Sequence, residues 1–108
     1  MKLNGRIWIE ESDKFIGIGR VELLELIKKT GSINKAAQTM NMSYKKAWGL
    51  VNSMNEQSSK PLVLTQTGGE KGGGATITDE AQRLIDAYKE IQERFKKFLS
   101  DETSKLHR

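Results

Sequence analysis

A chain of 108 residues is expected to form one domain, with no room for a second full-sized ligand-binding domain. Its 18 Lys and Arg against 14 Asp and Glu give a net charge of +4, which suits a polyanionic partner. With no Cys and a single His, a protein-built metal site is not expected, and we expect no cofactor. No signal-peptide pattern and no apolar run of about 20 residues occurs, so a cytoplasmic protein without a membrane partner is expected.

The first half of the chain predicts a β-hairpin and three helices. Alternating β-branched and aromatic residues around a polar turn favour a hairpin over residues 3–18. Apolar residues at helical spacing favour helices over residues 20–30, 32–40 and 43–57. Gly49 lies inside the third of these helices, which indicates that another group approaches the backbone closely there.

The second half predicts another β-hairpin and one long helix. The strands, residues 62–66 and 75–77, are joined by the glycine-rich segment 67–74, which is typical of a hairpin with a long tip. A helix is expected over residues 78–99, followed by a flexible polar tail over residues 100–108.

Two helices joined by a tight turn and followed by a glycine-rich hairpin predict a winged helix-turn-helix over residues 1–99. The expected fold class is therefore α+β and mainly α. The third helix is the expected recognition helix, with its first turn at the base edges of a major groove. Its candidate DNA contacts are Ser43, Tyr44, Lys45, Lys46, Trp48 and Asn52. For Trp48, a place in the core is an equal alternative.

The second helix and the wing are expected to contact the DNA backbone. The candidates are Ser32, Asn34, Lys35 and Gln38 on the helix, and Thr67, Lys71, Gly72 and Gly73 in the wing. As alternatives, the helix residues are ordinary surface residues and the wing is a plain hairpin tip. A nucleotide-binding loop is not expected, because Lys71 is followed by a glycine instead of Ser or Thr and the segment joins two strands.

The sequence offers little for catalysis. There is no Cys to act as a nucleophile, and the single His, His107, is isolated near the end of the chain. No pair of carboxylates is singled out for acid–base chemistry. An enzyme is therefore not expected.

The last helix carries apolar residues at alternating spacings of three and four, the pattern of a heptad seam. The candidates for dimerisation are Tyr88, Ile91, Phe95, Phe98 and Leu99. The first half of this seam is expected to pack on the helix's own domain, through Ala81, Leu84, Ile85 and Tyr88. We expect a homodimer, because aromatic residues beyond the reach of a small core favour pairing with a second chain.

The segments Ser43–Trp48 and Thr67–Ala75 resemble the N-terminal domain of the molybdate-responsive transcriptional regulators of ModE type. A looser similarity extends to the winged helices of LysR-type regulators. The ModE resemblance implies a dimeric domain that binds palindromic operators, with DNA contacts at Ser43, Tyr44, Lys45 and the wing around Lys71. The full-length regulators continue into oxyanion-binding domains, whereas this chain stops after its last helix, so molybdate sensing is not expected.

The expected function is that of a sequence-specific transcription regulator that binds double-stranded DNA as a homodimer. Two alternatives stay open: a winged-helix module for protein–protein interaction, and a non-specific architectural DNA-binding protein. The salt dependence of binding distinguishes the first alternative from DNA binding, because binding through several phosphates weakens steeply as the salt concentration rises.

Overall fold

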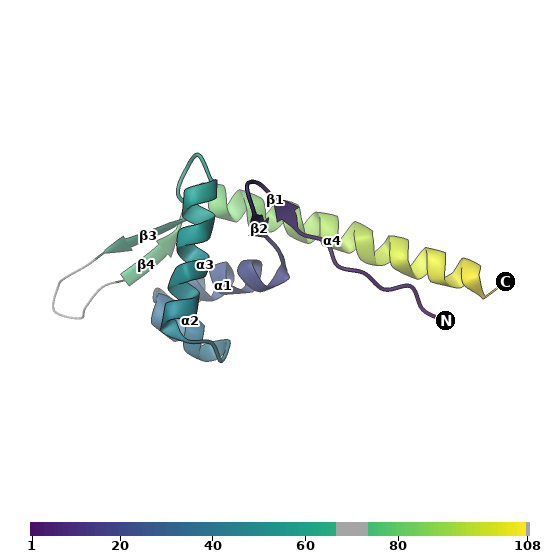
Figure 1. Ribbon diagram of the computed structural model, residues 1–108, viewed down its shortest axis with the longest axis horizontal. Helices are drawn as coiled ribbons and strands as arrows, with labels where there is room; N and C mark the ends of the chain where they lie inside the picture. The colour runs from purple at the N-terminus through teal and green to yellow at the C-terminus, as the bar shows by residue number, and fades with distance from the viewer. Residues whose placement is uncertain (67–73, 108) are drawn as a thin grey trace.

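The computed structural model of the chain describes residues 1–66 and 74–107. Within this part the chain has the predicted winged helix-turn-helix fold, mainly helical with two antiparallel hairpins (Figure 1). In chain order its elements are β1 (Ile9–Glu10), β2 (Lys14–Ile16), α1 (Ile18–Thr30), α2 (Ile33–Thr39), α3 (Tyr44–Gln57), β3 (Val63–Gln66), β4 (Gly74–Ile77) and α4 (Asp79–Leu106).

Local sequence signals set the ends of α1, α2 and α3. Gly31 ends α1 in the left-handed conformation with φ of 71°, and its N–H donates to the Ile27 carbonyl at 2.8 Å. Ser32 and Ser43 cap α2 and α3, each accepting a hydrogen bond from the backbone N–H three residues later. The tight turn between them places Asn41 at φ of 56°, which asparagine tolerates better than most residues. The helix-turn-helix is therefore confirmed.

The core lies where the three N-terminal helices meet the two hairpins and the first half of α4. α1 is buried on more than one side, as its apolar pattern predicts. The small side chains of α2 and α3 at the crossing allow the helices to approach closely. The buried apolar residues are Phe15, Ile16, Val21, Leu23, Leu24, Ile27, Ile33, Ala36, Ala37, Ala47, Val51, Met54, Leu62, Val63, Ala75, Ala81, Ile85 and Tyr88.

The first hairpin is shorter than the predicted residues 3–18. β1 and β2 pair antiparallel, but α1 begins at Ile18 and takes the residue expected to finish the second strand. Gln57, at the end of α3, holds the hairpin turn. Its Nε2 donates to the Lys14 carbonyl at 2.9 Å, and its Oε1 accepts from the Asp13 N–H at 3.0 Å. The hairpin is thereby fixed against the C-terminal end of α3.

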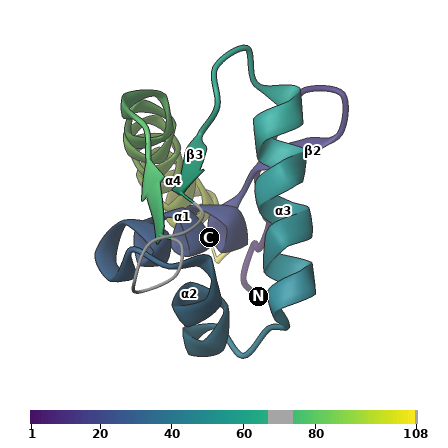
Figure 2. The ribbon, with the colours of Figure 1, turned by 90° about the vertical axis from the view of Figure 1, so that its left-hand side faces the viewer.

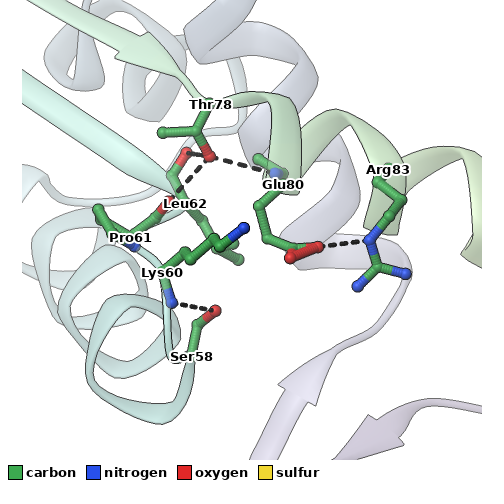
Figure 3. Close-up of polar contacts among 8 residues, drawn as sticks. Ser58, Lys60, Pro61, Leu62, Thr78, Glu80 and Arg83 are labelled. Atoms are coloured by element: carbon green, nitrogen blue, oxygen red, sulfur yellow. Dashed lines mark hydrogen bonds and ion pairs between the residues drawn. The ribbon is translucent and has the colours of Figure 1, made fainter.

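The wing, β3 and β4, is tied to the rest of the domain at its base. The Ala75 N–H of β4 donates to the Gly31 carbonyl at 2.9 Å, beside the turn between α1 and α2. Thr78 follows β4, and its Oγ1 donates to the Pro61 carbonyl at 2.8 Å while its N–H donates to the Leu62 carbonyl at 3.0 Å (Figure 3). The wing therefore leaves the domain in a fixed direction.

The last helix is longer than predicted. α4 continues to Leu106, so the prediction of a helix that ends at Leu99, followed by a flexible polar tail over residues 100–108, is wrong for this part of the chain. Two exposed ion pairs between residues three or four apart support the added turns. Arg108 lies outside the described residues.

The N-terminal segment, residues 1–7, starts beside the C-terminal end of α4 and runs back along that helix toward β1 (Figure 1). The Leu3 N–H donates to Thr103 Oγ1 at 2.9 Å, and His107 Nε2 lies 2.7 Å from the Met1 carbonyl oxygen. These contacts join residues about a hundred positions apart, so no local pattern could predict them. They are a further reason why the helix passes Leu99.

Candidate nucleic-acid interface

α3 turns one face to the core and the other outward (Figure 2). The buried face carries Ala47 and Met54, whereas Lys45, Gly49 and Asn52 form an exposed stripe at helical spacing. A methyl group added at Gly49 would meet no described atom within 4 Å. The close approach predicted at this glycine is therefore not made by the described part of the chain itself.

Tyr44 and Trp48 form an aromatic pair near the start of α3. Their ring centroids are 6.1 Å apart and the rings are perpendicular, a favourable edge-to-face arrangement. Tyr44 is 50% exposed, whereas Trp48 is partly buried and packs against the core. Trp48 therefore contacts both the core and the Tyr44 ring.

The first turn of α3 and the outer face of α2 carry the other predicted residues. Lys45 and Lys46 are exposed in that first turn, and the Ser43 hydroxyl before them caps the helix. On α2, Ser32 is partly buried and caps the helix in the same way. The exposed candidates on α2 are Asn34, Lys35 and Gln38.

The base of the wing lies beside the start of α2. The hydrogen bond from Ala75 to Gly31 joins β4 to the residue that precedes Ser32. The structure therefore brings together the two elements for which backbone contacts were predicted. The wing candidates Thr67, Lys71, Gly72 and Gly73 lie outside the described residues.

Ion pairs are distributed unevenly over the surface. Each ion pair found in residues 1–66 and 74–107 includes a residue of α4. The pairs are Arg83 with Glu80, Lys89 with Glu25, Lys96 with Glu93, Lys97 with Asp101, and Lys105 with Glu102. The cations of α2, α3 and the first hairpin form none within the described part. The exposed lysines of α2 and of the first turn of α3 therefore stand without an ion-pair partner among the described residues.

Arg20, near the start of α1, is a residue that sequence patterns did not single out. Its Nη1 donates to Ser53 Oγ at 3.1 Å and to the Phe15 carbonyl at 3.5 Å, so the guanidinium joins α1 to α3 and β2. Burial lowers the pKa of Arg20 from its usual value, and the nearby charge of Asp13 partly offsets this. The guanidinium remains charged at neutral pH. Its partners are distant in the chain, so spacing alone gave no signal for it.

Asn55 is a second residue that sequence patterns did not single out. Its Nδ2 donates to the Val63 carbonyl at 3.0 Å, and its Oδ1 accepts from the N–H groups of Leu62 and Val63 at 2.8 and 3.1 Å. Both ends of the amide are thus used by β3 and the residue before it. Asn55 therefore sets the position of the wing relative to α3.

The residues predicted for dimerisation lie in different environments. Tyr88 is 3% exposed and donates a hydrogen bond to a carbonyl of the N-terminal segment, so it belongs to the chain's own core. Phe95 and Leu99 are half-buried, and both lie against the N-terminal segment. Ile91 and Phe98 are 41% and 54% exposed. The exposed part of the predicted seam is therefore narrower than the heptad pattern indicated.

The described residues also bear on membrane insertion and metal binding. None of the helices there is long and apolar enough to cross a membrane. The same residues hold no group of three or more His, Cys, Asp or Glu side chains that could bind a metal ion.

Known proteins similar to this chain carry one name repeatedly. The transcriptional regulator ModE of Haemophilus influenzae is 42% identical over 95 residues, which cover 85% of this chain and 37% of that protein. This chain is a homologue of the ModE-type regulators. The DNA-binding transcriptional dual regulator ModE of Escherichia coli K12 is 43% identical over 86 residues, covering 77% of this chain and 33% of that protein.

A third relative extends the similarity beyond these two species. The molybdenum transport protein ModE of Azotobacter vinelandii is 36% identical over 88 residues, covering 82% of this chain and 33% of that protein. This chain spans about a third of the length of the curated relatives it matches. No family model matches the chain. The predicted resemblance to the ModE type is confirmed.

Proposed function

We propose that this chain is a sequence-specific, DNA-binding transcription regulator. The observation that carries the proposal is that Lys35 of α2 and Lys45 and Lys46 of α3 are exposed without an ion pair among the described residues, in contrast to the paired charges of α4. A polyanion is the partner that such a surface favours. The relatives named as transcriptional regulators, one of them DNA-binding, support the same conclusion.

The N-terminal half of α3 is the part that enters the major groove. Charge changes sign along its exposed side, because Lys45 and Lys46 occupy the first turn and Glu56 the last. Phosphates on either side of a groove attract the lysine end and repel the glutamate end. Tyr44, held by Trp48, and Asn52 are placed to contact base edges or phosphates.

The start of α2 and the wing contact the DNA backbone. Asn34, Lys35 and Gln38 are exposed on α2, and its capped N-terminus lies beside the wing base. These groups position the protein without reading sequence. For the wing, Thr67, Lys71, Gly72 and Gly73 remain the proposed contacts, along the minor groove or its phosphates.

We also propose that two copies pair through α4 and bind a palindromic site. Ile91 and Phe98 are exposed seven residues apart on the same face of the helix, with Phe95 stacked beside Phe98 at 6.5 Å. An open cavity of about 510 Å³ between α1 and α4 adjoins this face, lined in part by Ile18 and Gln92. Two recognition helices about 34 Å apart would then span half-sites one DNA turn apart.

Selection from a pool of random duplex DNA tests the proposal, followed by affinity measurements at low and physiological salt. We expect a palindromic sequence, bound at least about a thousandfold more tightly than random duplex, with a steep loss of affinity as salt rises. Binding without preference among sequences would instead indicate an architectural DNA-binding protein. Failure to retain any duplex at low salt would favour the protein-interaction module and overturn the proposal.

A further inference from the structure

An open pocket of about 250 Å³ lies on one flank of α3, among the first hairpin, the start of α1 and the turn between α2 and α3. Lys46 of α3 lines it. Asn55, which binds β3, follows Lys46 by nine residues, and at about 100° per residue this puts them on opposite sides of the helix. Figure 2 accordingly shows β2 and β3 on opposite sides of α3. The pocket and the wing therefore flank the helix.

Three cations from three elements line this pocket: Lys14 of β2, Arg20 of α1 and Lys46 of α3. None of them forms an ion pair with a residue of the described part, although the Lys14 ammonium lies 5.2 Å from the centroid of the Trp8 ring, in a cation–π contact. Arg20 is held in place by its hydrogen bonds to α3 and β2, and Asp13 acts on its charge without forming an ion pair. Asp13 offsets part of this positive charge, and a bound anion would lower the remaining repulsion among the three cations.

The rest of the lining suits a phosphate that carries apolar groups. Met40, Met42 and Leu50 supply apolar surface beside the cations, against which the carbons of a deoxyribose can pack. Gly19 in the first turn of α1 also lines the pocket, and that turn has no acidic residue. The positive end of the α1 dipole therefore adds to the charge of the three side chains.

We propose that this pocket binds a backbone phosphate of DNA on the side of the major groove away from the wing. The proposal rests on the proposed function, since it requires α3 to lie in the groove. A major groove about 12 Å wide has a phosphate backbone along each edge. The wing and the start of α2 lie at one edge, and Lys14, Arg20 and Lys46 lie at the other.

The first test compares two variants of the full chain, Lys14→Gln and Lys97→Gln, on the duplex recovered by selection. Both substitutions remove one positive charge from an exposed lysine, but Lys97 lies on α4 and pairs with Asp101. We expect Lys14→Gln to reduce the slope of log affinity against log salt by about 0.9 for each phosphate that the variant no longer neutralises, and Lys97→Gln to leave it unchanged. Lys14 is preferred to Arg20, whose removal would also break the hydrogen bond that holds α1 to α3.

Ethylation of individual phosphates locates the contact. With the wild-type chain, ethylation at either edge of the groove should interfere with binding, whereas Lys14→Gln and Lys46→Gln should lose only the interference at the edge away from the wing. If Lys14→Gln keeps both the salt slope and the interference pattern of Lys97→Gln, the pocket assignment is wrong and the proposed function stands. If the wild-type chain binds no duplex, the proposed function itself fails, and the pocket assignment fails with it.

Inorganic phosphate separates DNA from a free anion as the occupant. Binding of inorganic phosphate to the free protein that Lys14→Gln abolishes, together with an unchanged interference pattern on DNA, would assign the pocket to a free anion and overturn the proposal. Competition between inorganic phosphate and duplex for the wild-type chain, absent from Lys14→Gln, would support it.

Discussion

Two asparagines three residues apart on α3 have opposite environments. Asn55 uses its whole amide on Leu62 and Val63, whereas Asn52 is exposed and forms no side-chain hydrogen bond within the described part. Asn55→Ala leaves buried backbone groups unpaired, so we expect the free energy of unfolding to fall by about 2 kcal/mol. Asn52→Ala should change it by less than about 0.5 kcal/mol and weaken DNA binding instead. Urea denaturation measures the free energy of unfolding of both variants, and a binding assay measures their affinity for DNA.

These two variants act as controls for each other, since the residue type and the helix are the same. Equal losses of stability in both would contradict the role given to Asn55. An Asn52→Ala chain with unchanged affinity for its selected site would remove Asn52 from the proposed contacts.

Gly49 is the residue at which folding and binding make opposite demands. A glycine inside an exposed helix costs about 1 kcal/mol relative to alanine, and nothing in the described chain occupies the space of a methyl group there. We therefore expect Gly49→Ala to raise the melting temperature by about 5 °C. The same methyl group would stand between Lys45 and Asn52 on the face proposed to meet DNA, and we expect a loss of affinity of about tenfold. Calorimetry measures the melting temperature, and a binding assay on the same preparation measures the affinity for DNA. A variant that gains stability without losing affinity would show that DNA makes no close approach at this position.

At the scale of elements, we expect the loss of a lysine from α3 and the loss of a lysine from the wing to weaken DNA binding in different ways. Lys45→Ala on α3 should cost about 1–3 kcal/mol on the selected site and relax its sequence preference, because a base edge is left without its partner. Lys71→Ala in the wing should weaken binding to all duplexes about equally and lower the salt slope, because one fewer phosphate is neutralised. Affinities for the selected and a scrambled duplex, measured for both variants, separate the two. Unchanged affinity of Lys45→Ala for the selected site would place α3 outside the groove.

The elements that sequence patterns predicted are those with local signals. Gly31, Ser32, Asn41 and Ser43 mark the ends of the first three helices through their own backbone or side-chain chemistry, and the structure has each of them in that role. The period of apolar residues likewise gave the core face of α3. Such features depend on residues within a turn of one another, which is the range over which a sequence can be read directly.

The features that sequence patterns missed depend on partners in other elements of the fold. Arg20 bonds Ser53, Asn55 bonds the start of β3, and the N-terminal segment bonds the end of α4. Without their partners, the side chains of Arg20 and Asn55 are indistinguishable from those of ordinary polar surface residues. The early end predicted for the last helix has the same origin, because part of its support comes from a segment at the other end of the chain.

At the scale of the whole molecule, two kinds of surface are separated along the longest dimension of 64 Å. The α2–α3 end carries lysines that form no ion pair with described residues, and α4, extending beyond the domain, carries ion pairs and exposed apolar residues (Figure 1). This separation lets one end bind a polyanion while the other pairs with a second chain, since neither surface is consumed by the other contact.

The dimer prediction follows from that separation. Phe98→Glu and Ile91→Glu place a charge on side chains that are exposed in the single chain, so folding should be unaffected. Burying such a side chain stabilises by about 1.5–3 kcal/mol, and a twofold axis uses each residue twice, so we expect the dimer dissociation constant to rise at least about a hundredfold. Sedimentation measures the assembly, with Lys97→Gln on the same helix as the control. Affinity for the palindrome should fall with dimerisation, while affinity for an isolated half-site should stay unchanged, because linked sites bind more tightly only when joined. A dimer that survives both substitutions would move the interface from this face of α4 to another, with the cavity between α1 and α4 as the next surface to mutate.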